Sequence, residues 1–285
     1  MRKVALVINT DKPLAVEAGQ AIVTWLEGRG IQPAIHHEGA VRLNRVDLAL
    51  PAGKSWGEAE LLIVLGGDGT LIRAVKMVAP YGVPVLGINT GHLGFLTEVE
   101  NGEIFENLDR FLARDYLIEE RMMVAARVER QGRCLLEVTA LNDAVISKGP
   151  RARLVQLGVS VGETRVARYP ADGVIVATPT GSTAYSLSAG GPIVEPTVDC
   201  LLVTPICPHT INSRSIVVGG GEEISVTILE SPGEVGLSAD GSDPFPLHSG
   251  DVVHVKRAPY VARLVRRHSY RFYDVLRQKL ADPGR

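Results

Sequence analysis

The hydrophobic pattern of the chain changes near residue 116. Before this point, short apolar runs alternate with segments in which apolar residues recur every three or four positions. The runs predict strands at residues 4–8, 33–36, 61–65 and 83–88. Strands that alternate with helices indicate a mostly parallel sheet with flanking helices, so we expect an α/β domain at the N-terminus.

Helical spacing predicts helices between these strands. The first begins at Pro13 and ends at Gly28 or Gly30, because proline suits the first turn of a helix and glycine its end. Others are predicted directly after the strand at 61–65 and at residues 104–112. The face of the first helix that we expect to be buried consists of Leu14, Ala18, Ala21, Ile22 and Trp25.

After residue 116 the pattern consists of short runs in which apolar and polar residues alternate. Many short strands separated by turn residues predict an all-β sandwich as the C-terminal domain. The runs are at residues 122–128, 134–141, 154–161, 173–177, 201–204, 215–218, 224–229 and 252–256.

The tail of the chain is helical again. Tyr270, Tyr273, Leu276 and Leu280 share one helical face, which predicts a C-terminal helix that returns to the first domain. The expected boundaries are therefore 1–117 with 262–285 for the α/β domain and 118–261 for the β-sandwich domain.

The most informative segment is a turn of three glycines and one acid, Gly66-Gly67-Asp68-Gly69, between a predicted strand and a predicted helix. Glycines at this edge of a sheet let backbone N–H groups approach phosphate oxygens, and the helix N-terminus favours negative charge. A carboxylate repels phosphates, so Asp68 indicates either a base for a hydroxyl nucleophile or a metal ligand. Both imply phosphoryl transfer. A plain Gly/Asp turn is the structural alternative, and the spacing fits neither a P-loop nor a dinucleotide fingerprint.

A second segment, residues 172–192, repeats the order of strand, turn and helix. Ser182 or Thr183 is expected to cap the helix, which Gly190-Gly191-Pro192 would end. Its hydroxyls and N–H groups suit a neutral heterocycle and a ribose, and Tyr185 offers a stacking face. An ordinary capped helix explains the same residues.

A third segment places an amide beside a carboxylate, at Asn142 and Asp143. A turn there would let both side chains reach one ligand, with Asn142 at a base edge and Asp143 at a ribose hydroxyl. A turn-forming pair is the simpler explanation.

Two further patterns carry less chemistry. Gly158-Val-Ser160-Val-Gly162 matches the nucleophile elbow of hydrolases, but apolar alternation runs straight through it and predicts a strand that ends in a hairpin. Cys200, Cys207 and His209 match no zinc spacing, so we expect buried thiols and no metal held by the protein alone.

Composition places few limits on function. With 285 residues, two domains are expected, and a net charge of −2 gives no general electrostatic reason to bind nucleic acid or an anionic membrane. No segment has the length of a signal-peptide core or a membrane span. Three cysteines without a Cys-x-x-Cys pair favour a reducing compartment, so we expect a cytoplasmic protein.

Taken together, these segments resemble the NAD kinase family. Gly66-Gly67-Asp68-Gly69, Asn142-Asp143 and the stretch from Thr178 to Ser186 are similar to its three signatures, and Thr90 to Thr97 also looks like the family's. The resemblance implies transfer of the terminal phosphoryl of ATP, or of polyphosphate, to the 2′-hydroxyl of the adenosine ribose of NAD. A diacylglycerol-type lipid kinase with the same loop and a non-catalytic NAD sensor are the alternatives.

The resemblance also implies roles for individual residues. Asp68 would be the base, Mg²⁺ would be carried chiefly by the substrate phosphates, and the protein would be a homodimer or homotetramer. The turn at Asp240 would reach the site of a neighbouring subunit, although Ser242 and Pro170 differ from residues common in relatives. The implied binding residues are Gly66, Gly67, Gly69, Arg73, Phe95, Asn142, Asp143, Arg153, Asp172, Thr183, Ala184, Tyr185, Ser186, Ser188 and Asp240.

Overall fold

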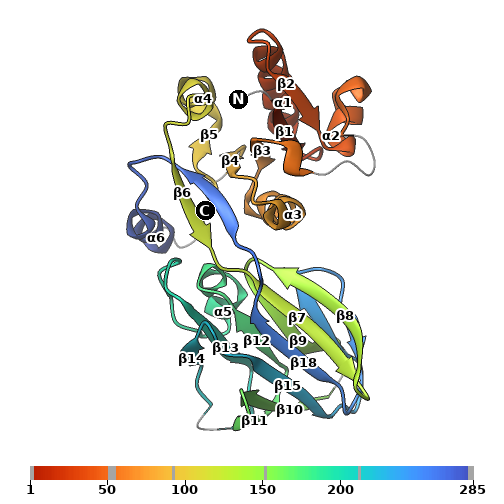
Figure 1. Cartoon of the computed structure of the whole chain (residues 1–285). Helices are drawn as coiled ribbons and strands as arrows, with labels where there is room; N and C mark the ends of the chain where they lie inside the picture. The colour runs from red at the N-terminus through yellow and green to blue at the C-terminus, as the bar shows by residue number, and fades with distance from the viewer. Residues whose placement is uncertain (1–2, 51–55, 92–93, 151–152, 211–212, 282–285) are drawn as a thin grey trace. The chain divides into compact units, whose positions relative to one another are not determined.

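The computed structural model describes residues 3–50, 56–91, 94–150, 153–210 and 213–281 (Figure 1). The chain forms two compact units, Met1–Glu120 with Val261–Arg285, and Arg121–Tyr260. Each unit has its own hydrophobic core. Among the described residues, no helix is long and apolar enough to cross a membrane.

The first unit is built on a seven-stranded sheet with the order β2-β1-β3-β4-β19-β6, in which β5 pairs with β4. The pairs β1–β2, β1–β3, β3–β4, β4–β5 and β4–β19 are all parallel. The predicted mostly parallel sheet is thus confirmed. The strands are β1 (Lys3–Ile8), β2 (Gln32–Ile35), β3 (Leu61–Gly66), β4 (Val85–Asn89), β5 (Val99–Glu100), β6 (Leu117–Arg121) and β19 (Ala262–Arg266).

Helices flank this sheet, as predicted. All six residues of β3 are buried, as expected for a central strand that is covered on both faces. The helices are α1 (Pro13–Glu27), α2 (His37–Arg42), α3 (Asp68–Val78), α4 (Ile104–Leu112) and α6 (Phe272–Ala281). Short 3₁₀ turns, η1 (Val46–Leu48), η2 (Trp56–Glu58), η3 (Ala79–Tyr81) and η4 (Asn101–Glu103), join them.

The first helix begins and ends where the sequence predicts, at Pro13 and before Gly28. Its predicted buried face is partly wrong, because Leu14 is 50% exposed and Ala21 is also exposed. The helix packs against β1 through Gly19, where an added Cβ would lie 2.6 Å from Ile8 Cδ1. With Gly19 against the strand, the buried side chains of the helix are those of Ala15, Ala18, Ile22, Val23 and Leu26.

The end of the chain belongs to the first unit, which confirms the predicted return of the tail (Figure 1, blue). The chain returns as a strand before it forms a helix, since β19 pairs with β4 at Leu264 and Val85. The predicted inner face of α6 is partly wrong: Tyr270 and Leu276 are half-buried, but the other two predicted residues are exposed. Tyr273 is 65% and Leu280 58% exposed, whereas Phe272 is buried.

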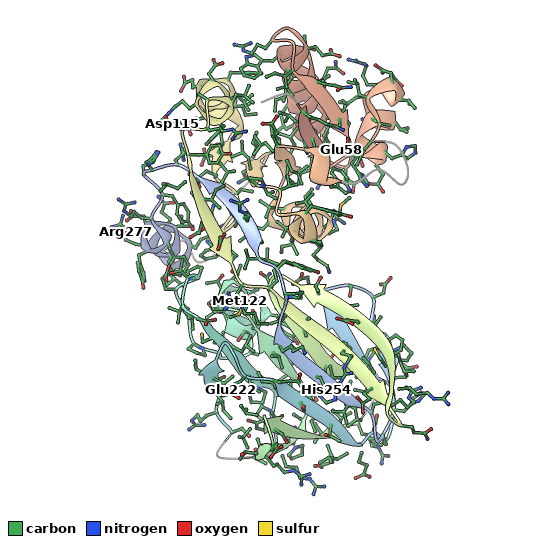
Figure 2. All side chains as sticks on the ribbon, in the orientation of Figure 1. Glu58, Asp115, Met122, Glu222, His254 and Arg277 are labelled. Atoms are coloured by element: carbon green, nitrogen blue, oxygen red, sulfur yellow. The ribbon has the colours of Figure 1, made fainter. Side chains whose placement is uncertain are left out.

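The second unit consists of two six-stranded sheets, with orders β11-β10-β15-β18-β7-β8 and β14-β13-β12-β9-β16-β17. Along β18, Val253 and Val255 are fully buried, whereas His254 between them, labelled in Figure 2, is partly exposed. The predicted β-sandwich is confirmed. Its strands are β7 (Val124–Arg130), β8 (Arg133–Ala140), β9 (Asp143–Lys148), β10 (Val155–Val161), β11 (Thr164–Ala171), β12 (Gly173–Ala177), β13 (Cys200–Ile206), β14 (Ile216–Gly219), β15 (Ile224–Glu230), β16 (Val235–Ala239), β17 (Phe245–Leu247) and β18 (Val252–Arg257).

The hydrolase-like pattern around Ser160 is structural, as predicted. Gly158 and Ser160 lie within β10, which continues to Val161 and turns into β11 at Thr164. A nucleophile elbow requires a turn into a helix at the serine, and this serine lies in a paired strand.

Candidate active site

The glycine turn lies at the carboxyl edge of the parallel sheet. β3 ends at Gly66, and α3 begins at Asp68 with Gly67 as its N-cap. Among the described residues, no side chain caps this helix N-terminus. The predicted order of strand, turn and helix is therefore confirmed, with Asp68 in the first turn of α3. Gly69 and Arg73 follow on α3 and are exposed.

The carboxylate of Asp68 is held by a segment 27 and 28 residues further along the chain. Its Oδ2 accepts a hydrogen bond of 2.8 Å from the N–H of Phe95, and its Oδ1 accepts one of 3.2 Å from the N–H of Leu96. Gly94 lies directly against it, since an added Cβ would be 2.0 Å from Oδ1. The segment Gly94–Leu96 therefore fixes the position of the acid. Residues 92 and 93 of the family-like stretch lie outside the described residues.

Lys12 also belongs to this edge of the sheet, although the sequence patterns did not single it out. Its ammonium Nζ lies 3.6 Å from the Cβ position of Gly67 and 3.4 Å from that of Gly91. Among the described residues, no ion pair of this ammonium group is found. A basic residue just beyond β1, which ends at the same edge, is the signal that would have revealed it.

Next to Lys12, the end of β4 carries polar side chains that are buried and not fully paired. The Oδ1 of Asn89 accepts the N–H of Gly91 at 3.0 Å, but its buried Nδ2 has no partner among the described residues. The same holds for the hydroxyl of Thr90. Asn89 is 3% exposed. Buried donors in native proteins are normally satisfied, so these groups beside a helix N-terminus are suited to bind an anionic ligand.

In the second unit, Asn142 and Asp143 lie at one end of a sheet. Asp143 begins β9, and the neighbouring strands β12 and β16 end beside it, at Ala177 and Ala239. A tight turn follows β16, with φ values of 52° at Asp240 and 71° at Gly241. Positive φ at both central positions is typical of a type I′ turn. This turn brings the carboxylate of Asp240 to the start of β9.

Asp240 binds the backbone of its own chain. Its Oδ1 and Oδ2 accept N–H groups of Leu141 at 2.8 Å, Asn142 at 2.8 Å and Asp143 at 3.2 Å. One carboxylate that accepts three backbone N–H groups fixes the loop that carries the Asn-Asp pair.

The hydroxyl-rich segment is attached to the same loop. The hydroxyl of Thr178 donates to the carbonyl of Leu141 at 2.6 Å and accepts the N–H of Gly181 at 3.1 Å. At Gly181 an added Cβ would lie 2.2 Å from the carbonyl oxygen of Asn142, so only glycine allows this approach. The three loops are thereby bound to one another.

Beneath these loops lies a cavity of about 370 Å³. It contains several predicted binding residues from separate parts of the sequence. Its lining consists of Asn142, Asp143, Val145, Ser147, Ala184, Tyr185, Ser238, Asp240 and Gly241.

The stretch from Thr183 to Ser188 places only part of its length at this cavity. It comprises the end of η5 (Thr180–Thr183) and the short helix α5 (Tyr185–Ser188). Tyr185 is 46% exposed, whereas the hydroxyl of Ser186 is buried and hydrogen-bonded to Thr204 at 2.9 Å. Ser188 is exposed, and Thr183 is half-buried. The predicted cap is wrong, because α5 has no side-chain cap within the part of the chain that the structure describes. The hydroxyl of Ser182 instead pairs with the backbone of Val194, and that of Thr183 donates to the carbonyl of Thr180.

Arg153 and Asp172 line a second, larger cavity of about 760 Å³ in this unit. The Nζ of Lys148 forms an ion pair of 3.0 Å with Oδ1 of Asp172. Ser147 lines the first cavity and Lys148 the second, so β9 connects the two. His209 also lines the second cavity.

The cysteines of the sandwich are free thiols. Cys200 is buried as predicted, but Cys207 is exposed because it follows the last residue of β13. Within the described residues, no group of three or more His, Cys, Asp or Glu side chains could hold a metal ion.

Asp143 has an unusual electrostatic environment. Only 5% of its surface is exposed, and burial raises the pKa of its carboxyl to about 7, with the nearby charge of Asp240 adding to the shift. The ionised form of Asp143 therefore costs folding free energy at neutral pH, because it is shielded from water. A ligand hydroxyl that donates to this carboxylate would form a strong hydrogen bond with it.

The chemistry of the two units is complementary. The first provides a fixed carboxylate, a lysine ammonium and a helix N-terminus, which suit a hydroxyl nucleophile and phosphates. The second provides a polar cavity with an amide, a carboxylate and a tyrosine, which suit a nucleoside. These are the features of an enzyme that transfers a phosphoryl group to a nucleotide-like acceptor.

Comparison with known proteins identifies the family. The chain matches the model of the ATP-NAD kinase N-terminal domain over residues 54–116 and that of the ATP-NAD kinase C-terminal domain over residues 141–267. An NAD kinase of Symbiobacterium thermophilum is 70% identical over 281 residues, covering 99% of each chain. One from Moorella thermoacetica is 45% identical, covering 100% of this chain and 91% of that protein.

Solved structures agree with this result. The crystal structure of yeast NADH kinase complexed with NADH has a TM-score of 0.88 and 26% identity, covering 100% of this chain and 89% of that chain. An NAD kinase from Archaeoglobus fulgidus in complex with ATP shares the fold, with a TM-score of 0.76. The chain belongs to the NAD kinase family and is therefore a phosphotransferase. The comparisons give no support to a lipid kinase or a non-catalytic sensor.

Gly94→Ala tests whether the segment Gly94–Leu96 positions Asp68. The added methyl group would overlap Oδ1 and displace the carboxylate. We expect turnover in NADP formation to fall by roughly 100-fold, because misplacement by about 1 Å has this effect in enzymes. Gly102→Ala, where nothing lies within 4 Å of the added Cβ, is the matched control. Equal turnover in the two variants would contradict this role of Gly94.

The raised pKa of Asp143 predicts a pH-dependent stability. In the folded state this carboxyl holds its proton up to about pH 7, whereas an unfolded aspartate loses it near pH 4. Its contribution to the free energy of unfolding should therefore decrease as pH rises from about 4 to 7, by up to about 4 kcal/mol. Asp143→Asn should raise the thermal midpoint at pH 8 relative to the original chain, with a smaller gain at pH 5. Calorimetry would show this, with the exposed Asp243→Asn as control.

Proposed function

We propose that this chain is an NAD kinase in which Asp68 acts as general base. The oxygen of the adenosine 2′-hydroxyl of NAD attacks the terminal phosphorus of ATP, or of polyphosphate. The bond from that phosphorus to the bridging oxygen breaks, and NADP and the shortened donor leave. The proton of the hydroxyl passes to Asp68. The observation that carries this proposal is the carboxylate of Asp68, fixed at a glycine turn on the carboxyl edge of the sheet.

The geometry of Asp68 suits orientation of the hydroxyl. Each carboxylate oxygen accepts one backbone N–H, and each has a further lone pair for a substrate hydroxyl. Phosphoryl transfer passes through a loose transition state that depends mainly on positioning and charge neutralisation. Asp68 therefore aligns the attacking oxygen and receives its proton as the phosphorus–oxygen bond forms.

Donor phosphates would bind at the N-terminus of α3. Lys12 supplies positive charge there, and the unpaired Nδ2 of Asn89 supplies a buried donor. Gly67 and Gly69 leave the backbone accessible, whereas Gly66 is buried at the end of β3. Arg73, exposed on α3, adds a second cation. Mg²⁺ would be bound mainly by the phosphates, as is usual for this ion, and would neutralise their charge.

The acceptor would bind in the second unit. Asn142 pairs with the edge of the adenine, Asp143 with a ribose hydroxyl, and Tyr185 offers its exposed ring as a stacking face. Ala184 completes this part of the site, while Arg153 and Asp172 in the larger cavity would contact the nicotinamide half. Phe95, in the stretch 90–97 that resembles the family, would also belong to the binding site.

The cellular setting is part of the proposal. A cytoplasmic enzyme is supported by three free cysteines, which favour a reducing compartment. A homodimer or homotetramer is expected from the family, with the turn at Asp240 near a subunit boundary.

Asp68→Asn tests the assignment of the base. An amide accepts only through its oxygen, so one of the two N–H groups from Phe95 and Leu96 loses its acceptor, at a cost of about 1–3 kcal/mol in stability. NAD binding by calorimetry should persist. NADP formation, followed by mass spectrometry after incubation with NAD, ATP and Mg²⁺, should fall by orders of magnitude.

The same assay compares NADH with NAD and polyphosphate with ATP. Near-normal turnover of Asp68→Asn would show that Asp68 is not the base. If the original chain forms no NADP with any of these donors, the proposed function is wrong.

Lys12→Ala tests the donor site. Loss of one ammonium group facing phosphates should raise the KM for ATP by roughly tenfold, which corresponds to about 1.4 kcal/mol, and leave the KM for NAD unchanged. Steady-state kinetics with each substrate varied in turn would measure both. Lys3→Ala is the control, because Lys3 begins β1, at the end of the strand opposite to the one that Lys12 follows, and it pairs with Glu58. A shift in the KM for NAD alone would place Lys12 at the acceptor instead.

A further inference from the structure

The segment that holds Asp68 is itself held by an arginine from the end of the chain. The Nη1 of Arg266 donates to the carbonyl of Leu96 at 3.0 Å, and its Nη2 donates to that of Phe95 at 3.4 Å. These are the two residues whose N–H groups bind the carboxylate of Asp68. Neither residue lies in a regular strand or helix. The guanidinium and the carboxylate thus bind the backbone of the same two residues, and both bind the peptide group between Phe95 and Leu96, one at its carbonyl and the other at its N–H.

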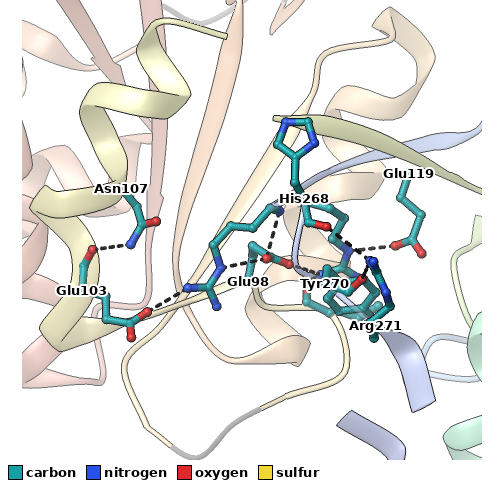
Figure 3. Close-up of polar contacts among 10 residues, drawn as sticks. Glu98, Glu103, Asn107, Glu119, His268, Tyr270 and Arg271 are labelled. Atoms are coloured by element: carbon teal, nitrogen blue, oxygen red, sulfur yellow. Dashed lines mark hydrogen bonds and ion pairs between the residues drawn. The ribbon is translucent and has the colours of Figure 1, made fainter. Parts of the chain in front are cut away.

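Arg266 is fixed in its surroundings by charge and packing. Its side chain is 2% exposed, at the end of β19. Its Nε donates to Glu119 at 2.8 Å, and its Nη1 contacts Glu98 at 3.2 Å. Figure 3 shows these two carboxylates, with Tyr270 beside them. The guanidinium carbon lies 4.1 Å from the centre of the Tyr270 ring.

The shape of the guanidinium matters for this arrangement. Its donors point in fixed directions in one plane, so two carboxylates and two carbonyls are reached at once. A lysine ammonium would retain the charge but lacks the fork that reaches both carbonyls. Because a buried charge is costly unless it is fully paired, the network has little freedom to rearrange.

We infer that Arg266 is a positioning residue for Asp68. It binds the carbonyls of Phe95 and Leu96, and the N–H groups of the same two residues hold the carboxylate. This inference rests on the proposed function of Asp68 as base. Arg266 ends β19 and lies 198 positions after Asp68 in the sequence. The consequence is that this late strand sets the alignment of Asp68 and thus the rate of the chemical step.

Arg267 offers a matched control. Its Nε contacts Glu98 at 3.1 Å and its Nη1 contacts Glu103 at 3.0 Å, so it belongs to the same ionic network. Arg267 makes no contact with the carbonyls of Phe95 or Leu96 among those described. We expect Arg266→Lys to lower kcat by roughly 10- to 100-fold, whereas Arg267→Ala should lower the thermal midpoint and leave kcat unchanged.

A double-variant cycle separates positioning from general destabilisation. If Arg266 acts through Asp68, Arg266→Lys should have little effect on the residual rate of Asp68→Asn, because the aligned carboxylate is already lost. If Arg266 only stabilises the fold, the fold reductions in rate caused by Arg266→Lys and by Asp68→Asn should multiply in the double variant. Residual NADP formation by mass spectrometry gives the rates.

The results that would overturn the role of Arg266 differ from those that would overturn the role of Asp68 as base. Unchanged kcat in a folded Arg266→Lys chain, or multiplying losses in the cycle, would overturn the role of Arg266 and leave Asp68 as base. Near-normal turnover of Asp68→Asn would overturn the base itself. Should Arg266→Lys fail to fold by circular dichroism, Glu119→Gln removes one charge that orients the guanidinium. We expect Glu119→Gln to lower kcat as Arg266→Lys does, and to have little effect on the residual rate of Asp68→Asn. If the fold reductions in rate caused by Glu119→Gln and Asp68→Asn multiply in the double variant, the inference is again overturned.

Discussion

The hydrogen bonds between a carboxylate and the backbone of a distant segment are the interaction on which both functional regions depend. A carboxylate at a phosphate site is repelled by its ligand and must be held in place by other contacts. In the first unit, the N–H groups of Phe95 and Leu96 hold Asp68. These neutral donors compensate the charge of Asp68, so in the proposed function the carboxylate would stay in place beside a negatively charged substrate without a cation attached to it.

In the second unit a carboxylate also binds the backbone of a distant segment, but here the carboxylate holds the backbone in place and not the reverse. There the carboxylate of Asp240 is the support, and the backbone that it binds carries Asn142 and Asp143. Asp240 reaches this loop only because it occupies a turn with positive φ, at 52°. Close approach of Gly181 to Asn142 then binds the hydroxyl-rich segment to the loop. In each unit, residues far apart in sequence become one rigid site through backbone groups, whose positions do not depend on side-chain rotamers.

Much of the fold could be predicted from sequence, including the strand, turn and helix that carry Asp68, because these elements depend on local patterns. The buried run before Gly66 and the glycine turn identified the strand, the helix and Asp68. The supports of the site could not be predicted in this way. Gly94 and Arg266 contact the site region only after folding, and the Arg266 contacts span 170 and 171 residues. Lys12 was missed because a lysine before a helix is unremarkable until β1 and β3 are known to be neighbours. The faces of α1 and α6 were misjudged because packing at Gly19 and at Phe272, not average hydrophobicity, sets which residues are buried.

The position of β19 in the first sheet has a consequence for how the chain folds as it is synthesised. β6 is joined to the sheet through β19, and β19 is made only after the whole β-sandwich. The sandwich is continuous in sequence, from Arg121 to Tyr260, so it can fold while the first unit still lacks a strand. Closure of the first sheet then requires contacts across most of the chain, which are slow to form. The enzyme thus completes the support of its acid last, and a chain truncated before residue 262 would contain the glycine turn without the strand that carries Arg266.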